Sequence, residues 1–184
     1  AEVETDPERI HAQRLAATFE LLLPALDVGF LIASSELSVV SADAPLVVRD
    51  FKFFHDRVQQ AAYALIEEEE RKSVHLRIAR LLTAATKDDV REGRVFSLAD
   101  QWNRAGELVT ELAERIALAE LNLAAGQRAR ISLAYGAARD YFAAGIRALG
   151  EDGIQLKPDL AWPLHRELAN AEYLVGNHSR AEEL

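Results

Sequence analysis

The chain has 184 residues, of which 49% are hydrophobic and 28% charged, with only 9 glycines and 5 prolines. This composition predicts a folded, mainly helical protein and argues against a disordered chain. The net charge of −9 disfavours broad nucleic-acid binding, and the absence of cysteine excludes disulfides and thiolate metal sites. No apolar run approaches the ~20 residues of a membrane-spanning helix, and no signal-peptide pattern opens the chain, so we expect a cytoplasmic protein.

The first helix is expected after a polar, irregular lead-in over residues 1–12. Apolar residues then recur at helical spacing between Leu15 and Leu26, with Phe19 on the same face. Gly29 follows at the position where a left-handed residue commonly ends a helix.

Two strands are expected next. FLIAS (30–34) and LVVRDFKFF (46–54) are rich in aromatic and β-branched residues, and turn-forming residues separate them. A helix followed by two strands is typical of the end of a winged-helix module, in which the strands form the wing. We therefore predict that residues 1–54 are a partial winged-helix-like segment.

A helical hairpin is expected over residues 55–85. Asp56 is placed to cap its first helix by accepting a backbone N–H. The glutamates at 67–70 stand between the two helices, where the helix dipole stabilises carboxylates in a first turn. The apolar stripe of the first helix comprises Phe54, Val58, Ala61, Ala62 and Leu65. The stripe of the second helix comprises Val74, Ile78, Leu81, Leu82 and Ala85.

The middle of the chain predicts a polar linker over residues 86–94 and then a short helix. The apolar face of this short helix comprises Val95, Ala99, Trp102 and Gly106. A long helix is expected from about residue 107 to residue 125, where Gly126 interrupts it.

The next helix, about 128–149, carries two apolar stripes. The first comprises Ile131, Tyr135, Ala138, Phe142, Ile146 and Leu149. The second comprises Ala134, Ala137, Tyr141, Ala144 and Ala148. A helix that is apolar on two flanks requires neighbours on both sides, as stacked helical hairpins supply.

A loop is expected over residues 150–163, with Pro163 in the first turn of the helix that follows. The apolar stripe of that helix comprises Leu164, Leu168, Ala171 and Val175. Gly176 ends the helix, and another helix begins after it.

Two stretches, ELNLAAGQRARISLAY (120–135) and ELANAEYLVGNHSRAEEL (167–184), resemble the helix–turn–helix unit of tetratricopeptide repeats. We place Gly126 and Gly176 at the turns between the paired helices. The two glycines are 50 positions apart, whereas the unit of that family has ~34 residues. The repeats are therefore degenerate.

This placement puts several residues at characteristic positions of the repeat. Around Gly126 they are Ala119 and Ala138 at small-residue positions and Tyr135 at an aromatic one. Around Gly176 they are Ala169 and Ala181. Ile131 stands where the family prefers alanine, the helices are longer, and no proline closes the unit.

A wider resemblance covers most of the chain and is carried by FKFFHDRVQQAAYALIEEEERKSVHLRIARLL, DQWNRAGELV and ERIALAELNLAAGQRARISLAYGAARDYFAAGIRAL, followed by the stretch over 167–184. These segments are similar to one region of very large bacterial signalling proteins, in which it follows a STAND-type AAA ATPase module. A serine/threonine-kinase-like domain often precedes that module, and GAF and histidine-kinase domains often follow. HDRVQQAAY is intact at residues 55–63, Glu67 replaces a common proline, and DQWNRA departs from the usual form.

The resemblance implies that residues 15–54 end a winged-helix segment and that residues 55–184 begin a tetratricopeptide-like helical-repeat region. The chain contains no methionine and stops within an expected helix. We therefore expect a fragment of a longer protein, truncated at the C-terminus.

Two histidines, His55 and His165, are candidate chemical groups. His55 and Asp56 could be a base and its orienting group, or half of a metal site, but no second histidine lies four residues on. A helix start capped by Asp56 explains the pair better. His165 resembles a phosphoacceptor histidine, but the expected downstream proline and the glycine-rich ATP-binding motifs are absent. A solvent-facing histidine on a repeat helix is favoured.

Other patterns also favour structural explanations. The glutamates at 67–70 point in four directions on a helix, whereas a calcium loop needs alternating oxygen ligands around a glycine turn. GEDGIQ (150–155) lacks the Lys-Ser/Thr pair of a phosphate loop. We predict no catalytic, cofactor-binding or metal-binding residues and no cofactor in this chain.

A basic set could contact DNA, as winged helices often do. It comprises Arg49, Lys52, Arg71, Lys72, Arg77 and Arg80. These residues scatter around apolar stripes in an acidic chain, which disfavours nucleic acid as a partner.

We predict an all-α fold of tetratricopeptide-like hairpin repeats, an α-solenoid, with a small winged-helix remnant. The first functional hypothesis is a non-catalytic interaction and relay segment of a signalling ATPase or kinase, with adjacent domains or a regulatory protein as partners. The alternative is a fragment of a winged-helix transcription regulator, which salt-dependent DNA retention would favour. A third hypothesis, intrinsic enzymatic activity, requires a pocket with convergent titratable groups.

Overall fold

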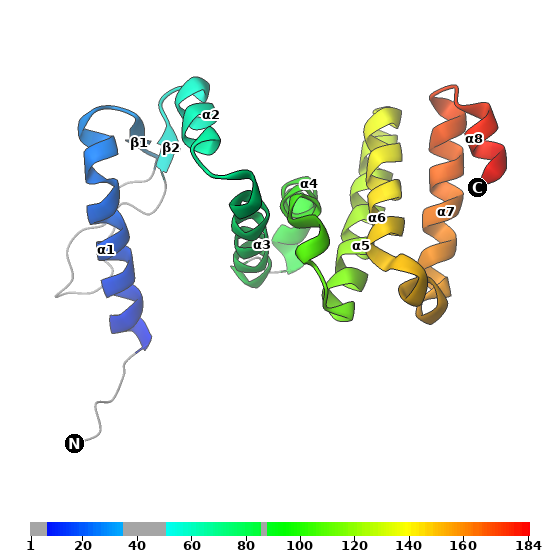
Figure 1. The fold of residues 1–184 in the computed structure, drawn as a ribbon, viewed down its shortest axis with the longest axis horizontal. Helices are drawn as coiled ribbons and strands as arrows, with labels where there is room; N and C mark the ends of the chain where they lie inside the picture. The colour runs from blue at the N-terminus through cyan, green and yellow to red at the C-terminus, as the bar shows by residue number, and fades with distance from the viewer. Residues whose placement is uncertain (1–6, 35–50, 86–87) are drawn as a thin grey trace, which may run out of the picture. The chain divides into compact units, whose positions relative to one another are not determined.

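The structure is a computed structural model that describes residues 7–34, 51–85 and 88–184 (Figure 1). Over these ranges the chain is mostly helical, with eight α-helices, one 3-10 turn and one pair of short antiparallel strands. Its contacts divide it into two compact units, residues 1–66 and 67–184.

The first unit contains α1 (Pro7–Asp27), β1 (Leu31–Ala33), β2 (Phe51–Phe53) and α2 (Asp56–Ala64). The second contains α3 (Glu68–Ala85), α4 (Asp88–Ala105), the 3-10 turn η1 (Gly106–Leu108), α5 (Leu112–Ile131), α6 (Tyr135–Leu156), α7 (Pro158–Leu174) and α8 (His178–Glu183). Helix α2, which we expected to begin the repeat region at residue 55, is grouped with the first unit.

Helix α1 ends as predicted. The Gly29 N–H donates to the carbonyl of Leu26 at 3.0 Å, and the Phe30 N–H donates to that of Ala25 at 2.8 Å. Gly29 has φ +75°, so this is a Schellman cap with glycine as its left-handed residue. The expected irregular lead-in is wrong for residues 7–12, because the helix begins at Pro7, where a missing N–H and a fixed φ suit the first helical position.

The two strands confirm the predicted pair in outline. They are antiparallel, with Leu31 opposite Phe53 and Ala33 opposite Phe51. Residues 46–50 of the predicted second strand lie outside the described residues. The winged-helix assignment itself stays a prediction.

The predicted capping role of Asp56 is wrong. The N-cap residue is His55, whose side chain makes no capping hydrogen bond, and Asp56 is the first residue of α2. Its carboxylate still lies in the first turn, where the helix dipole favours negative charge. The same holds for Glu68, Glu69 and Glu70 at the start of α3, as predicted.

The second unit consists of helices that follow one another side by side in chain order (Figure 1). Each of α3 to α8 packs against the next, and α5 also contacts α7. Consecutive helices can be grouped as α3 with α4, α5 with α6 and α7 with α8, although α6 contacts α7 more extensively than α3 contacts α4 or α7 contacts α8.

Helix α6 packs against other helices on both of its predicted flanks, but Ala134 and Ala137 of the second stripe are exposed. Phe142 is fully buried on one flank, in the main core cluster with Leu164 and Leu168 of α7. Tyr141 is half-buried on the other flank and packs against the cluster formed by Val95 and Ala99 of α4 and Ala125 of α5. Ile131 was wrongly included in the first stripe, since it belongs to the end of α5 and is 76% exposed.

The predicted turn at Gly126 is wrong. Helix α5 continues through Gly126 to Ile131, and Gly126 is buried. A Cβ on Gly126 would lie 2.6 Å from Cδ1 of Phe142, so the glycine lets the α6 ring approach the α5 backbone. Gly126, which predicted a helix break, instead marks a close contact between α5 and α6.

The turn between α5 and α6 lies at Leu133, which has φ +60°. The Leu133 N–H donates to the Arg130 carbonyl at 2.9 Å, and the Ala134 N–H donates to the Ala129 carbonyl at 2.9 Å. This is again a Schellman cap, with leucine at the position that glycine usually takes.

The turn between α7 and α8 has the same hydrogen-bond pattern, and here the prediction is confirmed. Gly176 has φ +91°, its N–H donates to the Tyr173 carbonyl at 3.0 Å, and the Asn177 N–H donates to that of Glu172 at 2.9 Å. The equivalent left-handed residues, Leu133 and Gly176, are therefore 43 positions apart rather than 50. In this register Gly126 corresponds to Ala169.

Two predicted irregular segments are helical. Helix α4 begins at Asp88, inside the expected linker, and α6 continues past a bend at Gly150 (φ +60°, ψ 179°) to Leu156. Helix α7 then begins at Pro158, so Pro163 lies inside it rather than in its first turn. The helix expected from residue 107 instead begins at Leu112, after η1.

The bend in α6 is supported by Arg115 of α5. Its Nε donates to the Ala148 carbonyl at 2.9 Å, and its Nη2 donates to the Leu149 carbonyl. These carbonyls precede the bend, and the arginine supplies hydrogen bonds at the point where the regular helical backbone is broken. The helix therefore continues across the bend without an intervening loop.

The buried face of α3 is rotated from the predicted stripe. His75 and Ala79 are buried, whereas Leu81 is 62% exposed. The His75 Nδ1 lies 2.7 Å from Oε1 of Gln101 in α4, so the buried ring has a hydrogen-bond partner across the pair.

We predict that Gly126→Ala lowers the free energy of unfolding by ~1–3 kcal/mol, because the added methyl group must displace the Phe142 ring. Gly93→Ala in α4 is the matched control, since nothing lies within 4 Å of a Cβ there. The control should raise the free energy by ~0.4–1 kcal/mol through the unfolded chain. Urea unfolding followed by circular dichroism measures both, and an equal effect of the two changes would contradict the close contact.

Candidate interaction groove

A groove of about 450 Å³ lies between α5 and the α3–α4 pair. Helix α5 supplies most of its lining, from positions spaced three and four residues apart along one face of the helix. The lining residues are Thr83, Val95, Trp102, Ala117, Glu120, Leu121, Ala124, Gln127, Arg128 and Ile131.

The floor of the groove is apolar. Val95 is buried in one cluster with Ala99 of α4 and Ala125 of α5, and half-buried Leu121 and Ala124 pack against this cluster. The small side chains of the alanines leave room above the floor. Such a surface gains free energy when an apolar side chain displaces its water.

The polar atoms at one wall of the groove are already paired. Trp102 Nε1 donates to Oγ1 of Thr83 at 3.1 Å, and Thr83 Oγ1 donates to the Ala79 carbonyl at 2.8 Å. The indole therefore contributes apolar surface without an unsatisfied N–H.

Tyr141 connects α6 to α4 by a hydrogen bond and a ring contact. Its hydroxyl donates to Oδ1 of Asp100 at 2.8 Å, and its ring centroid lies 5.7 Å from that of Phe96. Burial, reinforced by the hydrogen bond to the Asp100 carboxylate, raises the pKa of Tyr141 to about 12.

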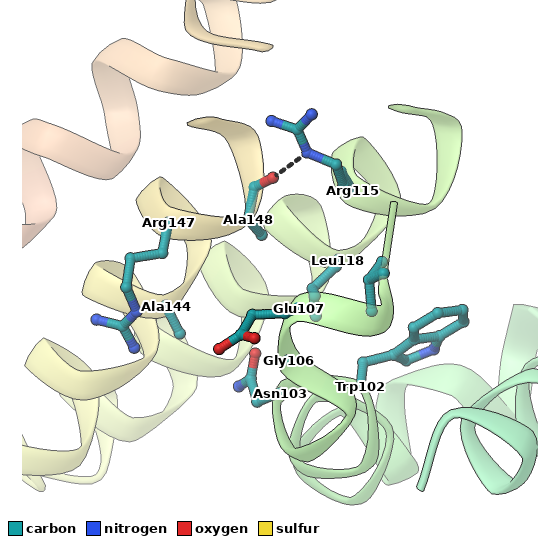
Figure 2. A pocket seen from close by; sticks show the side chains of 10 residues that line it. Trp102, Asn103, Gly106, Glu107, Arg115, Leu118, Ala144, Arg147 and Ala148 are labelled. Atoms are coloured by element: carbon teal, nitrogen blue, oxygen red, sulfur yellow. Dashed lines mark hydrogen bonds between the residues drawn. The ribbon is translucent and has the colours of Figure 1, made fainter. Parts of the chain in front are cut away.

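A second cavity, of about 350 Å³, lies where η1, α5 and α6 meet (Figure 2). It is lined by Trp102, Asn103, Gly106, Glu107, Val109, Arg115, Leu118, Ala144, Arg147 and Ala148. Arg115 is held there by its hydrogen bond to the Ala148 carbonyl, drawn in Figure 2. The Glu107 side chain is 90% exposed, and its Oε1 lies 3.6 Å from Nζ of Lys72.

An amide pair crosses the α4–α5 contact beside this cavity. Asn122 is fully buried, and it exchanges two hydrogen bonds with Asn103, at 2.8 and 2.9 Å. Asn122 Nδ2 also donates to the Leu118 carbonyl at 3.0 Å. These bonds fix the register of α4 against α5, because sliding either helix would leave the buried Asn122 amide unpaired.

The two candidate histidines, His55 and His165, lie in different environments. His55 is the exposed N-cap residue of α2. His165 is half-buried in α7, with Nδ1 2.9 Å from the Ala161 carbonyl, so it is less exposed than expected. Among the described residues, no three His, Cys, Asp or Glu side chains are grouped to hold a metal ion.

Arg80 and Lys72 of the predicted basic set form ion pairs. Arg80 donates twice to the Glu114 carboxylate, at 2.7 and 2.9 Å, and Lys72 faces Glu107. Lys52 and Arg77 are exposed, and Arg49 lies outside the described residues. The Arg80–Glu114 pair links α3 to α5, the two helices that flank the groove.

Sequence reasoning also missed a buried carboxylate. Glu167 of α7 is buried, with Oε2 3.3 Å from Nε of Arg130 in α5 and Oε1 3.2 Å from Nη2 of Arg166. No motif marks this residue. The charge complementarity becomes visible only when α5 and α7 are placed side by side.

Comparison with known proteins gives one informative similarity. No family model and no solved structure matches the sequence. The chain is 28% identical over 158 residues to hybrid signal transduction histidine kinase G of Dictyostelium discoideum. The match covers 73% of this chain but only 5% of that protein, so the chain resembles a small part of a signalling protein.

Within the residues that the structure describes, every helix falls short of the length and apolarity needed to cross a membrane.

We predict that Tyr141→Phe changes how stability depends on pH. Between pH 10, the ordinary pKa, and about 12, the unfolded tyrosine ionises while the folded one stays protonated. The unfolded state then binds fewer protons, so the contribution of this tyrosine to stability is lost as the pH rises. Urea unfolding at steps across this range should show the stability difference between wild type and variant falling. A constant difference would contradict the assignment.

Proposed function

We propose that this chain is a protein-interaction and relay segment of a multidomain signalling protein, in which the helix pairs form a tetratricopeptide-like solenoid. The observation that carries the proposal is the apolar groove between α5 and the α3–α4 pair. Its floor exposes apolar side chains between helices that are held in register by hydrogen bonds and ion pairs. A rigid, apolar, partly open surface suits the docking of another protein segment.

The similarity to a hybrid histidine kinase supports a signalling context. Helical pairs stacked in order transmit a displacement from one end to the other, because each pair packs only against its neighbours. In this proposal the segment carries no catalysis. ATP hydrolysis and phosphoryl transfer belong to other domains of the protein, and the partner is one of those domains or a regulatory protein.

The ion pairs of Arg80 and Lys72 weaken the DNA-binding alternative. A side chain already engaged by a carboxylate must give up that contact before it neutralises a phosphate. Retention on DNA that falls steeply with salt would still favour the alternative.

We predict that Ala117→Arg in the complete signalling protein alters kinase output while the fold is retained. Ala117 is an exposed lining residue of the groove, so an arginine there is compatible with the isolated fold but blocks an apolar partner. Burying an unpaired guanidinium should cost at least ~1.4 kcal/mol, or about tenfold in partner affinity. Autophosphorylation and ATP hydrolysis would be measured alongside circular dichroism.

The matched control is Ala137→Arg, which makes the same change at an exposed position of α6 outside the groove. The control should leave both activities at wild-type levels. If Ala117→Arg also leaves them unchanged, the groove carries no signal and the proposal fails.

A further inference from the structure

The cavity where η1, α5 and α6 meet differs in chemistry from the interaction groove, although Trp102 lines both (Figure 2). Its volume of about 350 Å³ suits a small organic molecule. Part of its wall is apolar and is formed by Trp102, Val109 and Leu118, which are all buried. Such a wall favours a ring or hydrocarbon body, which leaves its contact with water when it enters.

Arg147 of α6 supplies an unpaired positive charge to this cavity. Its exposed side chain belongs to the lining and makes no hydrogen bond or ion pair with any residue that the structure describes. By contrast, Arg80, Arg130 and Arg139 each pair with a carboxylate. A guanidinium that is free beside an apolar wall is suited to an anionic ligand, because it can donate two parallel hydrogen bonds to a carboxylate or a phosphate.

A second guanidinium lines the cavity and is fixed in position. Arg115 Nε donates to the Ala148 carbonyl at 2.9 Å, and its Nη2 donates to the Leu149 carbonyl. A guanidinium has five N–H donors, so further donors remain for a ligand after these two bonds. Gly150 makes this position possible, since a Cβ there would meet Nη2 of Arg115.

The charges of the lining residues leave a local excess of positive charge. The lining contains one carboxylate, that of Glu107, and its Oε1 lies 3.6 Å from Nζ of Lys72. Arg115 and Arg147 therefore outnumber a carboxylate that already faces a cation. Within a chain of net charge −9, this cavity favours an anion over a cation.

We propose that this cavity binds a small organic anion, with its carboxylate or phosphate on Arg147 and its apolar body against Trp102, Val109 and Leu118. Figure 2 shows Arg147 and Trp102 on opposite sides of Leu118, which places the charge-binding group and the indole at different ends of the cavity. The ligand would act as an effector that is bound and released unchanged. This inference goes beyond the interaction function of the groove and does not depend on it.

The test measures binding by nuclear magnetic resonance, with the indole N–H signals of the two tryptophans as reporters. Trp102 lines the cavity, whereas Trp162 of α7 is 72% exposed and lies outside the lining. Phenylacetate and phenyl phosphate are the anionic probes, and phenylacetamide is the neutral one. At least one anion should shift the Trp102 signal saturably at millimolar concentration and leave the Trp162 signal unchanged. The amide should bind about tenfold more weakly than that anion because it lacks the charge, and the tighter anion identifies the preferred group.

Arg147→Gln should weaken the binding of the anion about tenfold and leave that of the amide unchanged. Arg77→Gln is the matched control, because it removes the same charge from an exposed arginine of α3 outside the lining. The control should leave every affinity at the wild-type value, and both variants should keep the wild-type melting temperature. Equal effects of the two variants on anion binding, or none from Arg147→Gln, would overturn the inference.

A second pair of variants tests whether the ligand enters the cavity. Ala144→Leu fills space in the lining and should weaken the anion and the amide alike, whereas Ala137→Leu, at an exposed position of the same helix outside the lining, should weaken neither. If Ala144→Leu leaves anion binding unchanged, the anion binds Arg147 at the surface and the cavity assignment fails. The inference also fails if neither anion shifts the Trp102 signal saturably. None of these results bears on the Ala117→Arg test of the groove.

Discussion

The contact between α5 and α6 at Gly126 and Phe142 is the constraint on which the second unit depends. Only a residue without a Cβ lets the Phe142 ring pack onto the α5 backbone, and this contact sets the distance between the two helices. A second glycine, Gly145, repeats the arrangement, because a Cβ there would lie 2.7 Å from Leu164 of α7. The three helices are thereby locked into one core, and the other face of α5 is left to form the groove.

The α4–α5 contact uses a different kind of interaction. Its specificity comes from the hydrogen-bonded pair of buried Asn122 and half-buried Asn103. Its apolar surface comes mostly from alanines, with Val95 and Leu121. A buried amide pair stabilises little but penalises every other register. A groove with a defined shape follows from this combination, since its walls are fixed while its centre is lined by small residues.

Sequence periodicity predicted the elements whose signals are local. The two stripes on α6, the caps at Gly29 and Gly176, and the composition of each strand are signals carried within single continuous segments of the sequence. Gly126 was misassigned because glycine serves both as a helix end and as a site of close approach, and only the position of Phe142 in space distinguishes the two. The turn at Leu133 gave no signal, because leucine rarely adopts a left-handed backbone.

The groove could not have been predicted for a related reason. Its lining comes from three helices, and the boundaries of α4 and α5 both differ from the expected ones, so no spacing in the sequence places Val95 near Leu121. The groove-facing side of α5 runs from Ala117 to Ile131, beyond the predicted helix end at residue 125, and it mixes apolar residues with Glu120, Gln127 and Arg128. A mixed face of this kind does not stand out as an apolar stripe in the sequence, and the left-handed backbone of Leu133 just beyond it has no signal in the residue type.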